Sequence, residues 1–391
     1  MLRTLIVAAA LTTGMRSAVA EFNPWPAIAG KTPDLPAAAE IPLPVASILE
    51  PIRKRHDLPA MGAATVTSCG VRWSGVCGVR KRGTDAVVTL ADHWHLGSDT
   101  KAMTAWLAAR LAEESKISWG TTLESHFPDL AKTMRPEFRT VTLEELFSHQ
   151  AGFAAQFNLP QLERNARILA AGTVRQQRAE AARQLLVRPV DHPPRTRFAY
   201  TNVGYILAGA ILEKSADAEW EALMRRKVFG PLQMRAAGFG GTGTAGELDQ
   251  PWPHAADGRP LQNGPTTDNP PVLGPAGTVH ASLESWGAFV ADVLRGFRGE
   301  KGALSRASYD RLRSTPFGGT YTVGGWGRGE INGHSVYMHD GSNTLNYCTA
   351  IVIPQADLAV LVCTNQGGDA GRDACHAARR ELVDRSMAET R

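Results

Sequence analysis

Residues 95–106 read His-Leu-Gly-Ser-Asp-Thr-Lys-Ala-Met-Thr-Ala-Trp, and the other patterns of this chain are interpreted outward from them. An apolar, strand-like run precedes this segment, Gly97 permits a tight turn, and a stretch with almost no interior charge follows. This order predicts a strand end, a tight turn and the first turn of a buried helix. Because Ser98 and Lys101 are three residues apart, a helix places their side chains on one face, about one turn apart.

Ser98 and Lys101 form a candidate nucleophile and proton acceptor. A serine hydroxyl is a weak nucleophile until a neighbouring group takes its proton. A lysine amine can take that proton when burial and nearby charges keep the amine partly neutral. The start of the helix adds backbone N–H groups and a positive dipole end beside the serine. The same spacing arises by chance about once or twice in a chain of this length, so the strand–turn–helix context carries the prediction.

The composition is that of a globular protein without a strong net charge. The chain has 391 residues, of which 43% are hydrophobic, enough for one large domain or two lobes. Removal of the first 20 residues would take Arg3 and Arg16 from the 42 basic residues, and the remaining 40 stand against 38 acidic ones, a net charge of +2. A value so near zero gives no reason to expect nucleic acid or an anionic surface as a partner.

The first 20 residues have the pattern of a secretory signal peptide. Arg3 supplies a positive start, residues 5–11 form an apolar run, and residues 18–20 (Ala-Val-Ala) offer a cleavage site. A polar interruption shortens the apolar run, and a retained anchor is the alternative. Residues 21–44 carry six prolines and are expected to be extended. No later stretch approaches the ~20 apolar residues of a spanning helix, so we expect an exported, periplasmic or secreted protein whose mature chain has no integral membrane segment.

The cysteines leave the disulfide pattern open, and the histidines predict no metal site. An exported protein can form disulfides, and the five cysteines are Cys69, Cys77, Cys348, Cys363 and Cys375. A turn at residues 354–357 places Cys348 opposite Cys363, where a cross-strand disulfide and two facing buried thiols both fit. The odd number leaves at least one thiol free. His93 and His95 share one face of a short strand, but no further ligand cluster follows them.

The order of the predicted elements indicates an α/β fold. Strands are expected at residues 61–66 and 71–79, along the run 87–96, and later at residues 321–326, 333–338, 345–353 and 358–363. Helices are expected at residues 45–56, 105–111, 143–147, 176–186, 203–213, 219–227, 283–294 and 372–387, with a long surface loop at residues 238–275. This order implies an antiparallel sheet built from both ends of the chain, flanked by helices, with an all-helical lobe inserted. We therefore place a sheet lobe at residues 45–97 plus 276–391 and a mostly helical lobe at residues 98–275.

A second candidate motif is Tyr200-Thr201-Asn202, in a loop before the helix at residues 203–213. A phenol near a cationic lysine can ionise below its usual pKa of ~10 and then act as a base. The Asn202 amide both donates and accepts hydrogen bonds, which suits holding the lysine and a substrate carbonyl. The structural alternative is a core tyrosine followed by a helix N-cap.

A third candidate motif, His339-Asp340-Gly341-Ser342, ends one predicted strand and turns toward the next. A glycine at this position lets the backbone come close to a ligand. The backbone N–H of Ser342 could join that of Ser98 in an oxyanion hole, where one such donor contributes ~2.7–4 kcal/mol to transition-state stabilisation. The structural alternative is a strand-end histidine beside an ordinary glycine turn.

Together, the three motifs resemble those of the serine β-lactamase and penicillin-binding protein superfamily, in the branch with class C β-lactamases, certain D,D-peptidases and related esterases. The three follow one another in the order Ser-x-x-Lys, Tyr-x-Asn and His-x-Gly, and the first two patterns occur once each. Supporting phrases are Leu-Phe-Ser-His-Gln-Ala-Gly at residues 146–152, Phe-Ala-Tyr-Thr-Asn-Val-Gly-Tyr at residues 198–205 and Pro-Ala-Gly at residues 275–277. The resemblance covers residues 45–387 and implies a β-lactamase/transpeptidase-like fold.

The resemblance implies a role for each residue of the first two motifs. Ser98 would be the nucleophile, and Lys101 and Tyr200 would share the proton transfers, with Tyr200 passing a proton to the leaving group. Asn202 would position Lys101 and the substrate. The backbone N–H groups of Ser98 and Ser342 would form the oxyanion hole.

The third motif departs from the class C pattern. Class C β-lactamases have Lys-Thr-Gly there to bind a substrate carboxylate, whereas this chain has His339, Asp340 and Gly341, which we expect to line the substrate. Some D,D-peptidases and esterases of the group also use histidine at the first position, but the aspartate argues against efficient β-lactam hydrolysis. Gln156 falls near an amide-contacting glutamine of class C enzymes, and the resemblance implies a structural role for His149.

The resemblance predicts a β-lactamase-related serine hydrolase that forms an acyl-enzyme with an ester or amide. We expect an enzyme of the esterase or D-aminoacyl peptidase type with weak β-lactam activity. A true class C-like β-lactamase is one alternative, and a non-catalytic protein that binds β-lactams or peptidoglycan is another. The expected partner is a small ester, amide or β-lactam, and no cofactor or metal is required.

Overall fold

The computed structural model describes residues 43–154, 172–264 and 267–389. Three sequence predictions fall on other residues: the export signal at residues 1–20, most of the extended segment at residues 21–44, and Gln156 as a substrate contact. They lie outside the described residues and stay predictions. Within the described part of the chain, no helix is both long enough and apolar enough to cross a membrane.

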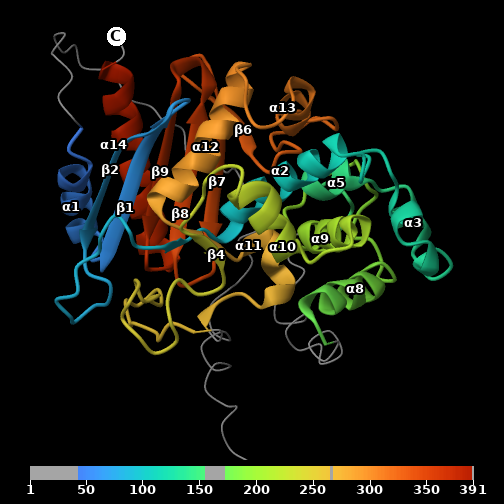
Figure 1. Ribbon diagram of the computed structural model, residues 1–391, viewed down its shortest axis with the longest axis horizontal. Coiled ribbons are helices and arrows are strands. Elements are labelled where there is room, and N and C mark those ends of the chain that lie inside the picture. Colours follow the sequence, from blue (N-terminus) through green and yellow to red (C-terminus); the bar gives the residue numbers. More distant parts are fainter. Residues whose placement is uncertain (1–42, 155–171, 265–266, 390–391) are drawn as a thin grey trace, which may run out of the picture. The chain divides into compact units, whose positions relative to one another are not determined.

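A six-stranded antiparallel sheet forms the centre of the fold, with the strand order β2-β1-β9-β8-β7-β6 (Figure 1). Its strands are β1 (Ala60–Thr67), β2 (Gly70–Gly78), β6 (Gly327–Ile331), β7 (His334–Ser342), β8 (Tyr347–Ile353) and β9 (Leu358–Thr364). Because β1 pairs with β2 on one side and β9 on the other, early and late parts of the chain meet inside the sheet. The predicted antiparallel sheet built from both ends of the chain is confirmed.

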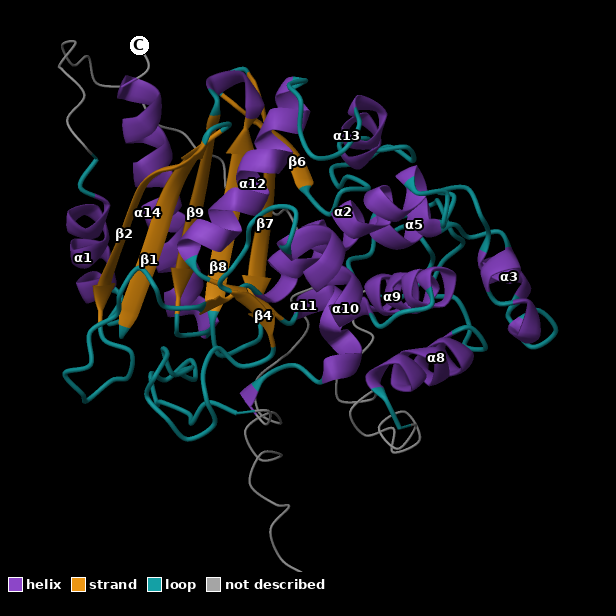
Figure 2. Cartoon of the chain, viewed as in Figure 1, coloured by secondary structure: helices purple, strands orange, loops and turns teal. Residues whose placement is uncertain are grey.

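Helices cover both faces of this sheet. Figure 2 shows α12 (Leu283–Arg298) crossing the near face of the strands and α14 (Gly368–Glu389) behind them, and α1 (Val45–Arg55) packs against β2 and α14. The N-cap of α12 is Ser282, whose side chain accepts a hydrogen bond from the backbone N–H of Ser285. Gly299 ends the helix with a φ of 85°, a conformation that glycine adopts without steric cost.

A second group of helices lies beside the sheet (Figure 1). Its members are α2 (Thr100–Glu113), α3 (Leu123–His126), α4 (Pro136–Arg139), α5 (Leu143–Phe147), α8 (Val174–Leu185), α9 (Val203–Ala216), α10 (Trp220–Met224), α11 (Gly274–Gly277) and α13 (Arg306–Leu312). Both α2 and α9 are buried on nearly every side and pack against each other, which explains why apolar residues occur all round these two helices.

A small second sheet has the order β3-β5-β4, and its strands are β3 (Trp94–His95), β4 (Ala237–Phe239) and β5 (Val279–Ala281). The strand expected along residues 87–96 is therefore wrong except near its end. The Asp92 carboxylate accepts hydrogen bonds from the backbone N–H and the hydroxyl of Thr89 and closes a turn there.

The strand predicted at residues 321–326 is also wrong, because the chain turns at this point. The backbone N–H of Thr322 donates to the carbonyl of Trp326 at 2.7 Å, and Gly325 has a φ of 78°. A Cβ on Gly325 would lie only 3.0 Å from the backbone nitrogen of Ala102, so the turn packs tightly against the start of α2. As a result, β6 begins at Gly327.

The five cysteines are free thiols. The predicted register is confirmed, since Cys348 on β8 stands opposite Cys363 on β9. Both side chains are buried, and each makes a hydrogen bond to the backbone instead of a disulfide. The thiol of Cys348 donates to the carbonyl of Leu96 at 3.0 Å, and that of Cys363 donates to the carbonyl of Gly62 at 3.3 Å.

A buried arginine ties α8 to α9 and α10. The side chain of Arg178 on α8 is fully buried, and its guanidinium contacts the carboxylates of Glu213 on α9 and Glu221 on α10. It also donates to the carbonyl of Pro271 at 2.8 Å. Because Glu213 is itself buried, it depends on Arg178 for its counter-charge.

Replacement of Arg178 by methionine is expected to lower the free energy of unfolding by about 3–5 kcal/mol, since it leaves a buried carboxylate unpaired. Arg183→Met is the matched control, because Arg183 lies on the same helix with its side chain 52% exposed. Urea denaturation of both variants measures the difference. Equal unfolding midpoints would show that the ion pair does not stabilise the fold.

Candidate active site

Ser98 lies on the short 3-10 turn that connects β3 to α2. The turn covers Gly97–Asp99, and Gly97 has a φ of 48°, in the left-handed region that favours glycine. Thr100 starts α2, so Ser98 and Lys101 occupy the entrance and the first turn of one helix. Ser98 is half-buried, whereas the residues on either side of it are buried.

The amine of Lys101 is completely buried and connects the first two motifs. Its Nζ lies 2.9 Å from Ser98 Oγ, 2.8 Å from Asn202 Oδ1 and 2.8 Å from the carbonyl oxygen of Ala276. Burial lowers the pKa of Lys101 to about 7, although Asp99 acts in the opposite direction. A neutral Lys101 donates its two protons to Asn202 and Ala276 and keeps a lone pair for the hydroxyl proton of Ser98.

The carboxyl group of Asp99 is the nearest acid in sequence to this amine, and it is buried as well. Burial raises the pKa of Asp99 well above its ordinary value, although the thiol of Cys348, which donates to Asp99 Oδ2 at 3.1 Å, acts in the opposite direction. A raised pKa makes Asp99 harder to ionise and so weakens its ability to hold Lys101 in the protonated form.

Tyr200 completes the group around Ser98. The Nζ of Lys101 lies 5.0 Å from the centre of its ring, and its phenol hydrogen-bonds with the Ser98 side chain. Burial nevertheless raises the pKa of Tyr200 above its ordinary value, which is opposite to the expected ionisation below ~10. Tyr200 is therefore a neutral phenol in the resting site, suited to relaying a proton rather than to acting as a standing base.

The end of β7 forms one side of the site. β6 pairs with β7 only as far as Met338, so His339 to Ser342 lie along an edge of β7 that β6 does not cover. Two glycines let this edge approach the Ser98 turn. A Cβ on Gly341 would lie 2.0 Å from the carbonyl oxygen of Leu96, and one on Gly97 would lie 2.3 Å from the backbone nitrogen of Ser342. The Ser342 backbone therefore lies directly beside the turn that carries Ser98.

His339 lines the site as a neutral ring. Its side chain is buried, and its Nε2 lies 2.8 Å from the hydroxyl of Tyr321. Burial, assisted by the nearby Lys101, lowers the pKa of His339 to about 3. The ring of Tyr321 also contacts those of His149, Phe198 and Tyr200, and this aromatic wall is the apolar environment of the site.

The structure does not bring Asp340 to the serine. Successive side chains of a strand point to opposite faces, so Asp340 faces away from His339 and toward α14. Its carboxylate lies 2.8 Å from His376 Nε2, accepts a hydrogen bond from Thr349 at 2.6 Å, and contacts Arg379. Burial alone would raise the pKa of Asp340, but these partners hold it well below its usual range. Asp340 was expected to line the substrate, but its charge is engaged on the other face of the sheet.

Two contacts of the site have no motif of their own in the sequence. Tyr321 lies in a turn that was expected to be a strand, so periodicity gave no signal for its position. The carbonyl of Ala276 belongs to the Pro-Ala-Gly phrase at residues 275–277, whose only sequence signal was the resemblance. His149 has the expected supporting role, since its Nδ1 accepts a hydrogen bond from the backbone N–H of Thr201 at 3.2 Å.

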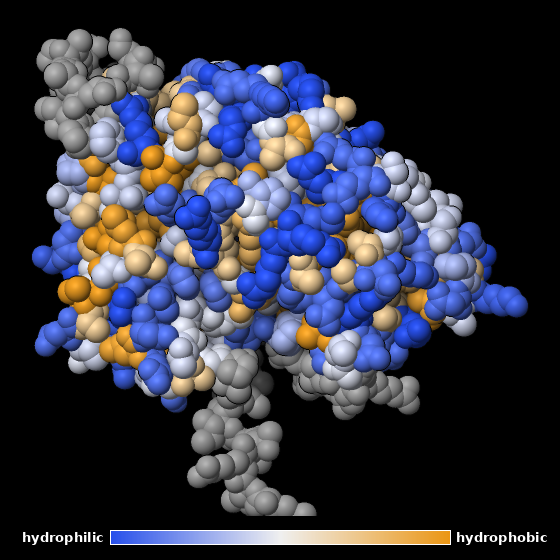
Figure 3. Space-filling model, in the orientation of Figure 1, coloured by the Kyte–Doolittle hydropathy of each residue, from blue (hydrophilic) through white to orange (hydrophobic). Residues whose placement is uncertain are grey.

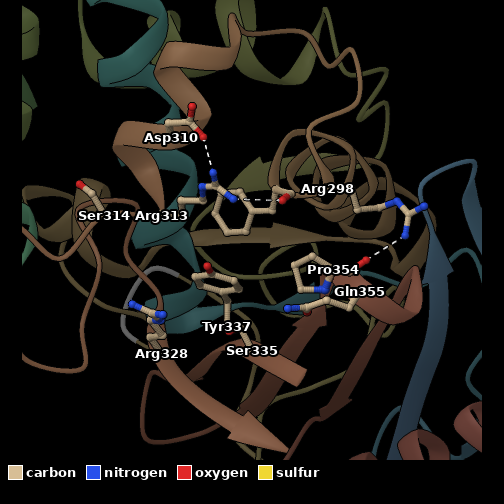
Figure 4. A pocket seen from close by; sticks show the side chains of 10 residues that line it. Arg298, Asp310, Arg313, Ser314, Arg328, Ser335, Tyr337, Pro354 and Gln355 are labelled. Carbon is tan, nitrogen blue, oxygen red and sulfur yellow. Dashed lines mark hydrogen bonds and ion pairs between the residues drawn. The ribbon is translucent and has the colours of Figure 1, made fainter. Parts of the chain in front are cut away.

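A hollow of about 620 Å³ lies away from Ser98, at the far end of β7 (Figure 4). Its arginines are largely committed to other partners: Arg313 pairs with Asp310 at 2.6 Å, and Arg298 donates to the carbonyl of Pro354 at 2.8 Å. Figure 3 shows a mostly hydrophilic near face with separate small hydrophobic patches. In the described part of the chain, no cluster of three or more His, Cys, Asp or Glu side chains is placed to hold a metal ion.

Comparison with known proteins identifies the family of the chain. The family model described as Beta-lactamase matches residues 45–384. Penicillin-binding protein 4 of Amycolatopsis lactamdurans is 26% identical over 345 residues, which cover 81% of this chain and 83% of that protein. The unguisins hydrolase ungD of Aspergillus violaceofuscus is 25% identical over 194 residues, which cover 46% of this chain and 31% of that longer protein.

Solved structures show the same fold. A beta-lactamase/D-alanine carboxypeptidase from Pseudomonas syringae has a TM-score of 0.69 at 16% identity, over 87% of this chain and 97% of that chain. A D-stereospecific amidohydrolase from Streptomyces has a TM-score of 0.65 at 20% identity, over 86% of this chain and 97% of that chain. The predicted β-lactamase/transpeptidase-like fold is confirmed.

The rate at which a fluorophosphonate probe labels Ser98 is expected to rise with pH through about 7 and then level off. Below that pH Lys101 is protonated and cannot accept the hydroxyl proton, and above it the lone pair is free. Labelling rates measured from about pH 5 to 9 test this, with Lys101→Met as a control that should label slowly at every pH. A flat profile for the natural protein would contradict the assignment.

Proposed function

Because the chain belongs to the beta-lactamase family, whose members are serine hydrolases, we propose that it hydrolyses an ester or amide through an acyl-enzyme on Ser98. The observation that carries the proposal is the contact at 2.9 Å between Ser98 Oγ and a buried amine whose pKa is lowered to about 7. A structural lysine on a helix surface would be exposed and protonated near neutral pH.

The acylation step uses four side chains. Lys101 takes the hydroxyl proton of Ser98 while Oγ attacks the carbonyl carbon. The negative oxygen of the tetrahedral intermediate accepts hydrogen bonds from the backbone N–H groups of Ser98 and Ser342. Tyr200 passes a proton to the leaving group as the bond to it breaks, and takes the proton of Lys101 in return. Asn202 holds the amine of Lys101 in place through its Oδ1.

Deacylation runs through the same groups in reverse. A water molecule gives a proton to the Tyr200–Lys101 pair and attacks the acyl carbon, again with the oxyanion on the two backbone N–H groups. The bond from the acyl carbon to Ser98 Oγ then breaks, and the oxygen regains its proton from Lys101. The products are a carboxylic acid and the alcohol or amine released in the first step.

The charge states of His339 and Asp340 favour a substrate that is recognised without a protein cation. His339 is neutral because burial lowers its pKa to about 3, and the Asp340 charge is paired with residues of α14 on the other face. Without a cation at the first position of the third motif, His339 offers a substrate carboxylate no opposite charge. We therefore place an esterase or D-aminoacyl amidase ahead of a true class C-like β-lactamase.

Two alternatives stay open to test. A β-lactamase would turn over a cephalosporin efficiently in spite of the neutral wall. A non-catalytic binding protein would hold a β-lactam or peptidoglycan fragment at Ser98 without turnover, but the poised Lys101 amine argues for catalysis. Export to the periplasm or the medium is part of the proposal and is supported by the N-terminal sequence pattern alone.

Replacement of Ser98 by alanine is expected to abolish both labelling by a fluorophosphonate probe and hydrolysis, while thermal unfolding stays unchanged. A panel of p-nitrophenyl esters, D-amino-acid amides and one chromogenic cephalosporin measures turnover, and Ser118→Ala, at an exposed serine, is the matched control. Residual hydrolysis by the Ser98 variant would remove this serine from its role. A kcat/KM above ~10⁴ M⁻¹s⁻¹ on the cephalosporin alone would favour the β-lactamase.

Replacement of His339 by lysine is expected to improve binding of a carboxylate-bearing ester relative to its neutral analogue by about tenfold, since a charge-assisted hydrogen bond adds about 1.5–3 kcal/mol. The ratio of the two KM values is the measurement. His339→Gln, which stays neutral, should leave that ratio unchanged. An unaltered ratio in the lysine variant would mean that this position does not read substrate charge.

A further inference from the structure

A buried pair of side chains lies behind the Ser98 turn and is not used by the mechanism above. His95, at the end of β3, and Asp268, in the long loop after β4, are both almost completely buried, and His95 Nε2 lies 2.7 Å from Asp268 Oδ1. The two residues are 173 positions apart in sequence, and no motif connects them. The pair therefore joins the surface-loop region to the segment that carries the nucleophile.

One end of this pair holds the Ser98 turn. The backbone N–H of Gly97 donates to His95 Nδ1 at 3.1 Å, and a backbone N–H is always the donor. The two nitrogens of one ring thus face different segments: Nδ1 faces the Gly97 backbone, and Nε2 faces Asp268. The orientation of Gly97 thus depends on the His95 ring, which contacts Asp268. The direction of the next backbone N–H, that of Ser98, depends on the orientation of Gly97.

The other end of the pair holds the turn after β7. Asn343 Nδ2 donates to Asp268 Oδ1 at 3.1 Å. The same amide accepts, through its Oδ1, hydrogen bonds from the backbone N–H groups of Leu345 at 3.2 Å and Asn346 at 3.0 Å. Asn343 directly follows Ser342, so one carboxylate oxygen is connected to both backbone segments of the oxyanion hole.

Holding two loops together with the buried carboxylate of Asp268 costs desolvation free energy. Burial raises the pKa of Asp268, and the contacts with His95 and Asn343 more than offset it, so that the group stays ionised. An ionised group out of water carries a desolvation cost that an apolar contact between the same loops would avoid. This charge lies between the Ser98 and Ser342 segments, where it contacts one residue next to each.

We propose that Asp268, acting through His95 and Asn343, is a positioning residue that fixes the spacing between the Ser98 and Ser342 backbone N–H groups. The inference rests on the proposed serine hydrolase activity and adds a residue that no motif identifies. Preorganised donors stabilise the tetrahedral intermediate only when they are held at hydrogen-bond distance from its oxygen. Loss of the contacts of Asp268 with His95 and Asn343 would then weaken binding of the transition state more than binding of the substrate.

The test uses Asp268→Asn in the full chain, with p-nitrophenyl butyrate as substrate and phenylboronic acid as the probe. The boron bonds to Ser98 Oγ and becomes tetrahedral, which places an oxygen in the oxyanion position. We expect kcat to fall about tenfold or more with little change in KM, and the inhibition constant of the boronic acid to rise by a similar factor. Asp249→Asn is the matched control, because Asp249 lies in the same loop and accepts hydrogen bonds from Thr244 and nearby backbone rather than from His95 or Asn343.

Asn343→Asp is a second variant that keeps the acceptor for the turn and loses the donor to Asp268. It should shift kcat and the boronic acid constant in the same direction as Asp268→Asn. Active-site titration with the fluorophosphonate corrects both variants for misfolded protein. If the titrated Asp268 variant kept the kcat of the Asp249 control, Asp268 would have a structural role only and the inference would be overturned. If Ser98→Ala hydrolysed the ester as well as the natural protein does, the proposed function itself would fail.

Discussion

The hydrogen bond between the buried amine of Lys101 and the hydroxyl of Ser98 is the interaction on which the rest of the site depends. An ionised acid would stabilise a protonated amine in this position, but burial raises the pKa of Asp99, and the other hydrogen-bond partners of the amine named here are uncharged oxygens. The enclosure therefore favours loss of the lysine proton near neutral pH. A surface lysine with the same spacing to a serine would stay protonated near neutral pH and would have no lone pair for the hydroxyl proton.

Close backbone approach is the second requirement, and glycine meets it on both sides. Gly97 and Gly341 leave no side chain between the turn that carries Ser98 and the open edge of β7. The aromatic wall around Tyr321 then encloses the groups that these glycines bring together. Reactivity and geometry thus come from different parts of the chain: α2 supplies the amine, and the sheet supplies the edge against which the turn packs.

The sequence predicted the sheet, its two-ended construction and the group around Ser98, because these depend on local spacing and on motifs. It did not predict the turn at residues 321–326, where tight packing against α2 overrides an apolar pattern. It assigned Asp340 to the substrate because a motif does not show which face of a strand a side chain takes. The ionisation expected for Tyr200 failed for a related reason: the extent of burial is a property of the assembled fold.

The attachment of Asp340 to α14 affects the order in which the protein assembles during synthesis. The ribosome synthesises Ser98, Lys101 and Tyr200 well before β7, the strand that faces them. In the same way, β1 is complete long before β9, its partner toward the centre of the sheet. The support behind β7 comes from His376 and Arg379, near the end of the chain. Long-range pairing of this kind forms slowly. The nascent polypeptide thus carries Ser98, Lys101 and Tyr200 before β7 and its support from α14 have been synthesised, and the contacts of the site are completed only with the last helix.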